Sequence, residues 1–266
     1  MERSIRIHMF GSFRLVIDGK QVGHWRAGKA RDLLQYLLLR QGRQVPRSTL
    51  YEALWPEAAW SSNSSSLKVA VHMLRRVLTD TGEAPYLGAP MLRLVTSELG
   101  YSLEARNIWL DCDVFEELTD CGMRAEAAGR REEAQRFFRE AAELYEDDFL
   151  VGVNTEWAAL RREWLRSRLL QVLHKLVNMD VERGELLTVT HWCRRMIELE
   201  PFHEEAYRTL MRVHAQLGQL NQVRRWYELC TTRLRDEICA EPAATTVDLY
   251  QRAMRGALTL HDSIPQ

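Results

Sequence analysis

A short stretch near residue 70 places cations, an imidazole and apolar groups on one side of a predicted helix. Arginine and lysine donate hydrogen bonds to guanine or phosphate, histidine can do either, and an apolar side chain can lie against a thymine methyl group. The helix is predicted from about Ser65 to Leu78, and its other side carries Leu67, Val71 and Leu74. We interpret its polar side as a surface that enters a major groove, the alternative being an amphipathic helix with a few basic residues exposed to solvent. The candidate groove-facing residues are Lys68, Val69, His72, Met73, Arg75 and Arg76.

The other reactive side chains lack the spacing of an active site or a metal site. The sequence has no glycine-rich phosphate loop, GxSxG motif, HExxH motif or paired carboxylates in a plausible pocket. The eight histidines lack ligand spacing to one another or to cysteine, and the acidic run at 146–148 is interpreted as a solvated helix end. The five cysteines form no CxxC motif, so reduced, structural thiols are expected. We predict no catalytic residue, no metal and no cofactor, and therefore no enzyme.

Length and composition predict a folded protein of two domains. At 266 residues the chain is long for one compact domain, and 46% hydrophobic and 27% charged residues are ordinary for globular proteins. Its longest uncharged apolar stretch, Leu33 to Leu39, is far shorter than the roughly 20 residues that span a bilayer. The N-terminal residues do not resemble a signal peptide, so we expect no membrane partner and a cytoplasmic location.

Charge is distributed unevenly along the chain. Residues 1–105 carry a net charge of +5 and residues 106–266 a net charge of −6. A basic unit joined to an acidic one is typical of a nucleic-acid-binding domain attached to a regulatory or protein-binding domain, although excesses of this size also occur in unrelated proteins. We place the domain boundary between residues 105 and 106.

The hydrophobic pattern of residues 1–105 predicts a small sheet, three helices and a hairpin. Residues 5–17 alternate as a strand pair does, and Asp18-Gly19 is a turn signal. Apolar residues recur at three and four positions from Gly28 to about residue 41, and again from residue 46 to Leu54, which predicts two helices before the third. Strand-like segments at 91–96 and 101–103 form the hairpin. This order of elements is that of a winged helix, an α+β fold.

This half resembles the winged-helix DNA-binding domain of the response-regulator type, in the form found in the Streptomyces antibiotic regulatory protein family of transcriptional activators. The matching residues are Gly28-Lys29-Ala30-Arg31, Leu33-Leu34, Leu37-Leu38-Leu39, Gly42-Arg43, Val45, Arg47, Leu50, Ala53-Leu54-Trp55, Leu74-Arg75-Arg76-Val77-Leu78 and Gly100-Tyr101-Ser102-Leu103. The resemblance implies that the third helix enters the major groove of double-stranded promoter DNA and that the hairpin wing approaches the minor groove. It also implies that the loop between the second and third helices contacts the RNA polymerase holoenzyme. That loop contributes Trp55, Glu57, Trp60, Ser61 and Asn63. One departure is Glu98 at the wing tip, where a basic residue would help phosphate contact.

The second half repeats a helical unit. Gly129, Gly184 and Gly218 each open a segment with an aromatic residue eight positions later, and the last two glycines are 34 residues apart, the tetratricopeptide period. A long helix from about residue 156 to 183 makes the array irregular. We predict an all-α, tetratricopeptide-like domain over residues 106–266, a fold that usually binds other proteins. Four tryptophans are interpreted as core residues, the alternative being interface anchors: Trp157, Trp164, Trp192 and Trp226.

The order of these segments resembles the bacterial transcriptional activation domain of the same family. The supporting residues are Asp111, Asp113, Phe115, Gly129, Glu133-Ala134, Leu144-Tyr145, Phe149-Leu150, Trp157, Pro201, Glu204-Glu205-Ala206, Leu210-Met211, Gly218, Tyr227, Leu234 and Glu241-Pro242. The resemblance implies side-by-side dimerisation, hence a homodimer on DNA, and contacts with the transcription machinery. Relatives commonly have glycine where this chain has Cys239, and since cysteine lacks glycine's access to positive φ, the local turn could differ.

Three function classes follow for this multidomain, mainly α chain. The leading hypothesis is a sequence-specific DNA-binding transcriptional activator that binds repeated promoter sites as a dimer and recruits RNA polymerase. The second is a helical-repeat scaffold whose winged helix binds protein instead of DNA, motivated by Glu98 and the modest basic charge. The third, with the least support, is an enzyme or small-molecule receptor with a pocket in the helical half.

Overall fold

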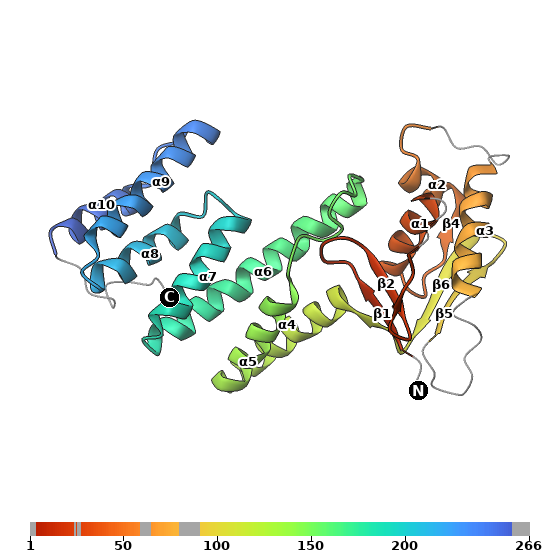
Figure 1. The fold of residues 1–266 in the computed structure, drawn as a ribbon, viewed down its shortest axis with the longest axis horizontal. Helices are drawn as coiled ribbons and strands as arrows, with labels where there is room; N and C mark the ends of the chain where they lie inside the picture. The colour runs from red at the N-terminus through yellow and green to blue at the C-terminus, as the bar shows by residue number, and fades with distance from the viewer. Residues whose placement is uncertain (1–3, 24, 26–27, 59–64, 80–90, 257–266) are drawn as a thin grey trace. The chain divides into compact units, whose positions relative to one another are not determined.

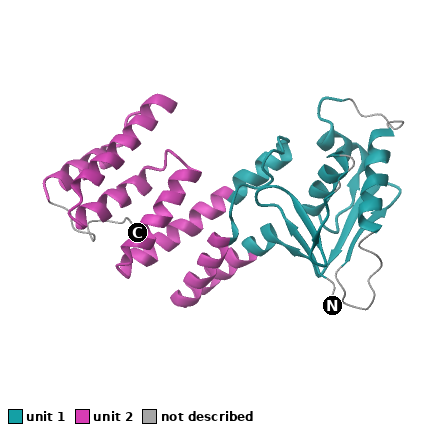
Figure 2. Cartoon of the chain, viewed as in Figure 1, with its two compact units in different colours: residues 1–116, 144–165 teal, residues 117–143, 166–266 magenta. Residues whose placement is uncertain are grey.

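The computed structural model describes residues 4–23, 25, 28–58, 65–79 and 91–256. Their contacts divide the chain into two compact units (Figure 2). Unit 1 comprises Met1–Glu116 and Leu144–Leu165, and unit 2 comprises Glu117–Glu143 and Arg166–Gln266. Unit 1 thus includes a segment from beyond residue 106, and the boundary between residues 105 and 106 stays a prediction about domains.

The N-terminal sheet of unit 1 follows the alternation predicted for residues 5–17. β1 (Ile5–His8) pairs antiparallel with β2 (Arg14–Ile17), and a turn leads to β3 (Lys20–Gln21). The turn residues Asp18 and Gly19 have φ of 50° and 77°, as a two-residue hairpin turn requires. β7 (Trp109–Leu110) adds parallel to β1, so the order is β3-β2-β1-β7. The sequence pattern did not predict β7, because two residues are too few to show alternation.

Residues 148–151 extend this sheet beyond the end of β1. Backbone hydrogen bonds join residues 9–11 to them, the shortest being 2.7 Å from the amide of Leu150 to the carbonyl of Met9. Phe10 packs against Tyr145 with ring centroids 4.4 Å apart, and Phe115 packs against Tyr145 at 5.6 Å. All three rings are buried. These contacts explain why residues 144–165 belong to unit 1.

A buried carboxylate fastens the two residues that follow β1 to the start of α4 (Asp111–Ala127). Asp111 is 2% exposed and accepts hydrogen bonds of 2.7 to 3.0 Å from the backbone amides of Met9, Phe10 and Cys112. Burial raises the pKa of Asp111 from 3.8 to about 6, although the three amides oppose the shift. The sequence analysis noted Asp111 only among the residues that resemble a bacterial transcriptional activation domain. The structure shows that its carboxylate joins the start of α4 to Met9 and Phe10.

The winged-helix part of unit 1 combines three helices with a three-stranded sheet (Figure 1). The helices are α1 (Gly28–Leu38), α2 (Arg47–Leu54) and α3 (Ser65–Thr79). β5 (Met91–Thr96) pairs antiparallel with β6 (Gly100–Arg106), and β4 (Val45–Pro46) pairs with the other edge of β6. α3 packs against α1 and β5. The predicted winged helix is confirmed.

Unit 2 is all-α, as predicted. It contains the larger part of each of three helices: α4, α5 (Arg131–Leu144) and the long α6 (Glu156–Glu182), which begins in unit 1. It also contains the whole of α7 (Leu186–Leu199), α8 (Glu204–Gln216), α9 (Leu220–Ile238) and α10 (Ala244–Met254). α7, α8 and α9 pack in succession, and α10 packs against α8 and α9. The three glycines that set the repeat phase have φ of 69° to 74°, so each ends the preceding helix in the left-handed conformation.

The expectations for three side chains have clear outcomes. Cys239 caps α9 at φ 54°, so the chain makes a left-handed turn there although the residue is not glycine. Trp192 is 5% exposed and its indole N–H donates to Asp180 at 3.0 Å, as expected for a core residue. Trp164 is 51% exposed, so the core interpretation is wrong for this tryptophan.

Candidate DNA-binding surface

α3 exposes the side chains that the sequence analysis assigned to a major groove. Leu67, Val71, Leu74 and Leu78 are buried on the side that packs against α1 and β5. Of the candidate residues, Met73 is half-buried, and Lys68, Val69, His72, Arg75 and Arg76 are exposed. Val69 is 54% exposed, which leaves an apolar group beside the cations. This mixture suits base edges, and the assignment to a groove stays a prediction.

The six candidates differ in position around the helix axis. Because successive residues of an α-helix are rotated by about 100°, His72 and Arg76 lie near the centre of the exposed face, with Met73 and Arg75 toward its opposite edges. The guanidinium of Arg75 donates a hydrogen bond to the hydroxyl of Thr96 on β5. Arg75 therefore connects α3 to the hairpin, whereas Arg76 contacts no acceptor among the described residues.

The hairpin β5–β6, or wing, ends in a tight turn from Ser97 to Gly100. The amide of Ser97 donates to the carbonyl of Gly100 at 3.0 Å, and the amide of Gly100 donates to the hydroxyl of Ser97 at 3.2 Å. Gly100 lies against β4, where a Cβ atom would come within 1.9 Å of the carbonyl oxygen of Val45. Only glycine fits this position without displacing the backbone. Glu98 is exposed in the turn.

The segment predicted to contact RNA polymerase begins at the end of α2. The amide of Trp55 donates to the carbonyl of Tyr51 at 2.8 Å, and the two rings stack with centroids 4.9 Å apart. The ammonium of Lys29 lies 5.7 Å from the Trp55 ring centroid and donates to the carbonyl of Leu54 at 2.5 Å. Glu57 is exposed. The start of the segment is therefore anchored, while Trp60, Ser61 and Asn63 lie outside the described residues.

Metal ligation and thiol chemistry find no support in the described part of the chain. No group of three His, Cys, Asp or Glu side chains there could hold a metal ion. Burial raises the pKa of the Cys193 thiol to about 12 and that of Cys230 to about 11, so both stay protonated and weakly nucleophilic near neutral pH. Within the same residues, no helix has the length and apolar character needed to cross a bilayer.

Unit 2 contains a cavity of about 190 Å³ between α6, α7 and α8. Val177 and Met196 supply apolar surface, and His174, Asn178 and Glu205 supply polar groups. Its position matches the helical half to which the receptor hypothesis assigned a pocket. No motif in the sequence connects these residues with a particular ligand.

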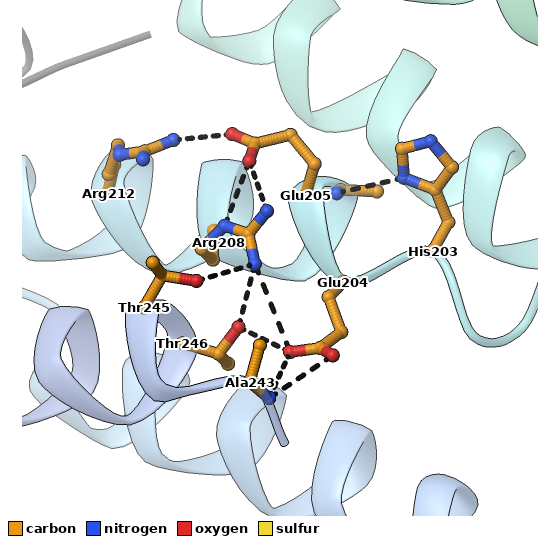
Figure 3. A network of polar contacts seen from close by, with 9 residues as sticks. His203, Glu204, Glu205, Arg208, Arg212, Ala243, Thr245 and Thr246 are labelled. Atoms are coloured by element: carbon orange, nitrogen blue, oxygen red, sulfur yellow. Dashed lines mark hydrogen bonds and ion pairs between the residues drawn. The ribbon is translucent and has the colours of Figure 1, made fainter. Parts of the chain in front are cut away.

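A polar network in the same unit fastens α10 to α8 (Figure 3). The carboxylate of Glu204 accepts hydrogen bonds from the amide of Ala243 at 3.0 and 3.2 Å and from the hydroxyl of Thr246 at 2.5 Å. Ala243 is the N-cap residue of α10 and has no side chain that could accept a hydrogen bond. Glu204, 39 residues earlier in the chain, supplies the capping carboxylate instead. Arg208 extends the network, since it donates to Thr246 and to Glu205 at 2.8 Å. The sequence analysis noted these glutamates in a resemblance but could not pair them with α10.

Comparison with known proteins agrees with both halves of this architecture. Residues 110–253 match the family model described as bacterial transcriptional activator domain. Residues 25–92 match the model described as transcriptional regulatory protein, C terminal. The first model covers the helical region from α4 almost to the end of α10, and the second covers α1, α2, α3 and the start of β5.

The chain is similar to named regulatory proteins and to one solved structure. Regulatory protein AfsR of Streptomyces coelicolor is 26% identical over 253 residues, which are 95% of this chain and 24% of AfsR. Regulatory protein DnrI of Streptomyces peucetius is 27% identical over 86% of this chain and 85% of DnrI. The chain therefore spans about a quarter of AfsR and most of DnrI. The structure of Mycobacterium tuberculosis EmbR in complex with a low affinity phosphopeptide has a TM-score of 0.75 at 22% identity, covering 97% of this chain and 67% of EmbR.

Proposed function

Since this chain belongs to the bacterial transcriptional activator domain family and is a transcriptional regulator of the Streptomyces antibiotic regulatory protein type, we propose that it binds repeated promoter sites as a dimer and recruits RNA polymerase. Its relatives are named as regulators and not as enzymes. The promoter sites, the dimer and the polymerase contact are proposals for this chain, which is much shorter than AfsR.

The exposed face of α3 is the observation that carries the proposal. It presents Lys68, His72 and Arg76 together with the apolar Val69, on a helix that packs against α1 and β5. A merely solvated helix face would mix acids with bases, and no acidic residue occurs between Ser65 and Thr79. One copy of this surface neutralises few phosphates, which favours binding as a dimer to repeated sites.

The test is selection of bound duplexes from random DNA over a series of salt concentrations, followed by sequencing of the enriched pool. We expect a direct repeat whose spacing gives the arrangement of the two copies on DNA. Ala substitution of Arg75 or Arg76 should then weaken binding by about 1 to 3 kcal/mol if either residue contacts a base. Absence of enrichment, with weak retardation that vanishes at physiological salt, would favour the protein-binding scaffold instead.

The polymerase contact requires a separate test because it leaves DNA binding intact. Glu57 is exposed just beyond α2 and forms no ion pair with another described side chain. We expect Glu57→Lys to lower transcription from the selected promoter in a reconstituted reaction while the affinity for the promoter stays unchanged. Equal transcription by the variant and the wild type would remove Glu57 from the proposed contact.

A further inference from the structure

The wing carries no cation of its own at the tip. Between Thr96 and Tyr101 the side chains are those of Ser97, Glu98 and Leu99, with Gly100 completing the turn. Glu98 is exposed, and Leu99 is 72% exposed. A wing that approaches DNA with a single negative charge would be repelled by the phosphates. A cation from another element is therefore needed beside the turn.

Arg47, the first residue of α2, brings a guanidinium to this turn. Its Nη1 donates to the carbonyl of Glu98 at 2.5 Å, and its Nη2 donates to the carbonyl of Ser97 at 3.0 Å. The guanidinium carbon lies 5.6 Å from the ring centroid of Tyr101, the residue that follows the turn. Two successive carbonyls and one ring thus fix the orientation of Arg47 relative to the wing.

The guanidinium retains hydrogen-bonding capacity in this position. A guanidinium has five N–H donors in a planar fork, and the contacts with Ser97 and Glu98 use one on each terminal nitrogen. The remaining donors meet no acceptor among the described residues. Arg47 is half-buried, so part of its charge reaches the surface next to the exposed Glu98.

We propose that Arg47 supplies the phosphate contact of the wing and at the same time fixes the turn that presents it. The proposal rests on the function proposed above, since it assigns a backbone phosphate of the promoter as the ligand. Arg47 compensates for the acidic Glu98 at the tip, because it places a positive charge from α2 where the hairpin has none. Arg75 donates a hydrogen bond to Thr96 at the end of β5, so α2 and α3 each contribute an arginine that contacts the wing.

The experiment measures equilibrium binding of the full chain to the enriched duplex by fluorescence anisotropy over a series of NaCl concentrations. Arg47→Gln removes the charge and keeps an amide donor for the turn, whereas Arg47→Lys keeps the charge and loses the planar fork. Arg93→Ala is the matched control, because Arg93 pairs with Glu104 in the same hairpin at 2.8 Å and lies about 10 Å along the strand from Thr96. Circular dichroism confirms that each variant is folded.

The slope of log affinity against log salt distinguishes a phosphate contact from a structural role. We expect the slope of Arg47→Gln to fall by about 0.9, the value for one phosphate contact, and the slopes of Arg47→Lys and Arg93→Ala to equal that of the wild type. Equal slopes in the wild type and Arg47→Gln would overturn the proposal, even with a weaker affinity. If the wild type itself enriches no sequence, the proposed function fails. If the wild type binds an enriched duplex but Arg47→Gln leaves the salt slope unchanged, only the role of Arg47 fails.

Discussion

Removing the buried carboxylate of Asp111 should strongly destabilise unit 1. In Asp111→Ala the amides of Met9 and Phe10 lose their acceptor in a site that is 2% exposed. Each buried N–H left unpaired costs about 1 to 3 kcal/mol, so the expected loss of unfolding free energy is about 4 kcal/mol. Asp111→Asn retains one oxygen acceptor but turns an amide NH₂ toward a backbone N–H. This variant should therefore lose less unfolding free energy than Asp111→Ala.

The stability of the wild type should also depend on the protonation of Asp111. Its pKa of about 6 in the folded protein exceeds the ordinary 3.8, so the folded state binds more protons between these values and its stability falls as pH rises through this window. The two pKa values correspond to a decline of about 2 kcal/mol from pH 4.5 to pH 7. Asp111→Asn cannot titrate, so the advantage of the wild type over it should be about 2 kcal/mol larger at pH 4.5 than at pH 7.

Hydrogen exchange of the β1 and β2 amides, followed by mass spectrometry, measures the opening free energy of unit 1 separately from unit 2. Glu117→Gln is the control, because Glu117 is an exposed carboxylate on α4 that forms no ion pair with another described side chain. An Asp111→Ala variant that loses less than about 1 kcal/mol would refute the role of the carboxylate as acceptor. A wild type and Asp111→Asn variant with identical pH dependence would refute the assigned titration.

Three further substitutions test other features of the fold. Glu204→Ala should destabilise α10 by about 1 to 2 kcal/mol because the helix loses its cap, and hydrogen exchange in that helix should become faster. Glu241→Ala is the control and should have no measurable effect, because the ion pair of Glu241 is exposed to solvent. Gly100→Ala should lower the melting temperature sharply, since its Cβ would overlap a backbone oxygen, while Gly28→Ala, which meets nothing within 4 Å, should leave it unchanged. Cys239→Gly should raise the unfolding free energy of unit 2 by about 0.5 to 1 kcal/mol, because glycine adopts its left-handed conformation without strain; a loss of stability would contradict this reading of the turn.

Features with a short sequence period were predictable, and features that join distant segments were not. The stripe from Leu67 to Leu78 predicted α3 and its exposed face because the helical period is local. The pairing of residues 9–11 with 148–151 leaves no such signal, since a pattern within one segment does not identify a partner so far along the chain. The contacts of Asp111 with Met9 and of Glu204 with Ala243, the N-cap residue of α10, span 102 and 39 residues. Periodicity therefore located the elements and their buried sides, while long-range polar contacts required the coordinates.

The assembly of unit 1 from two chain segments affects the order of events during synthesis. The ribosome releases the winged helix and β7 well before residues 144–165, which pair with residues 9–11 and cover Phe10. Until those residues emerge, the apolar surface around Phe10 and Phe115 stays uncovered by Tyr145. The nascent chain thus completes unit 1 only after residues 144–165 of the helical half have been translated. A gene fragment that stops at residue 105 would encode the wing and α3 without the residues that close their own unit.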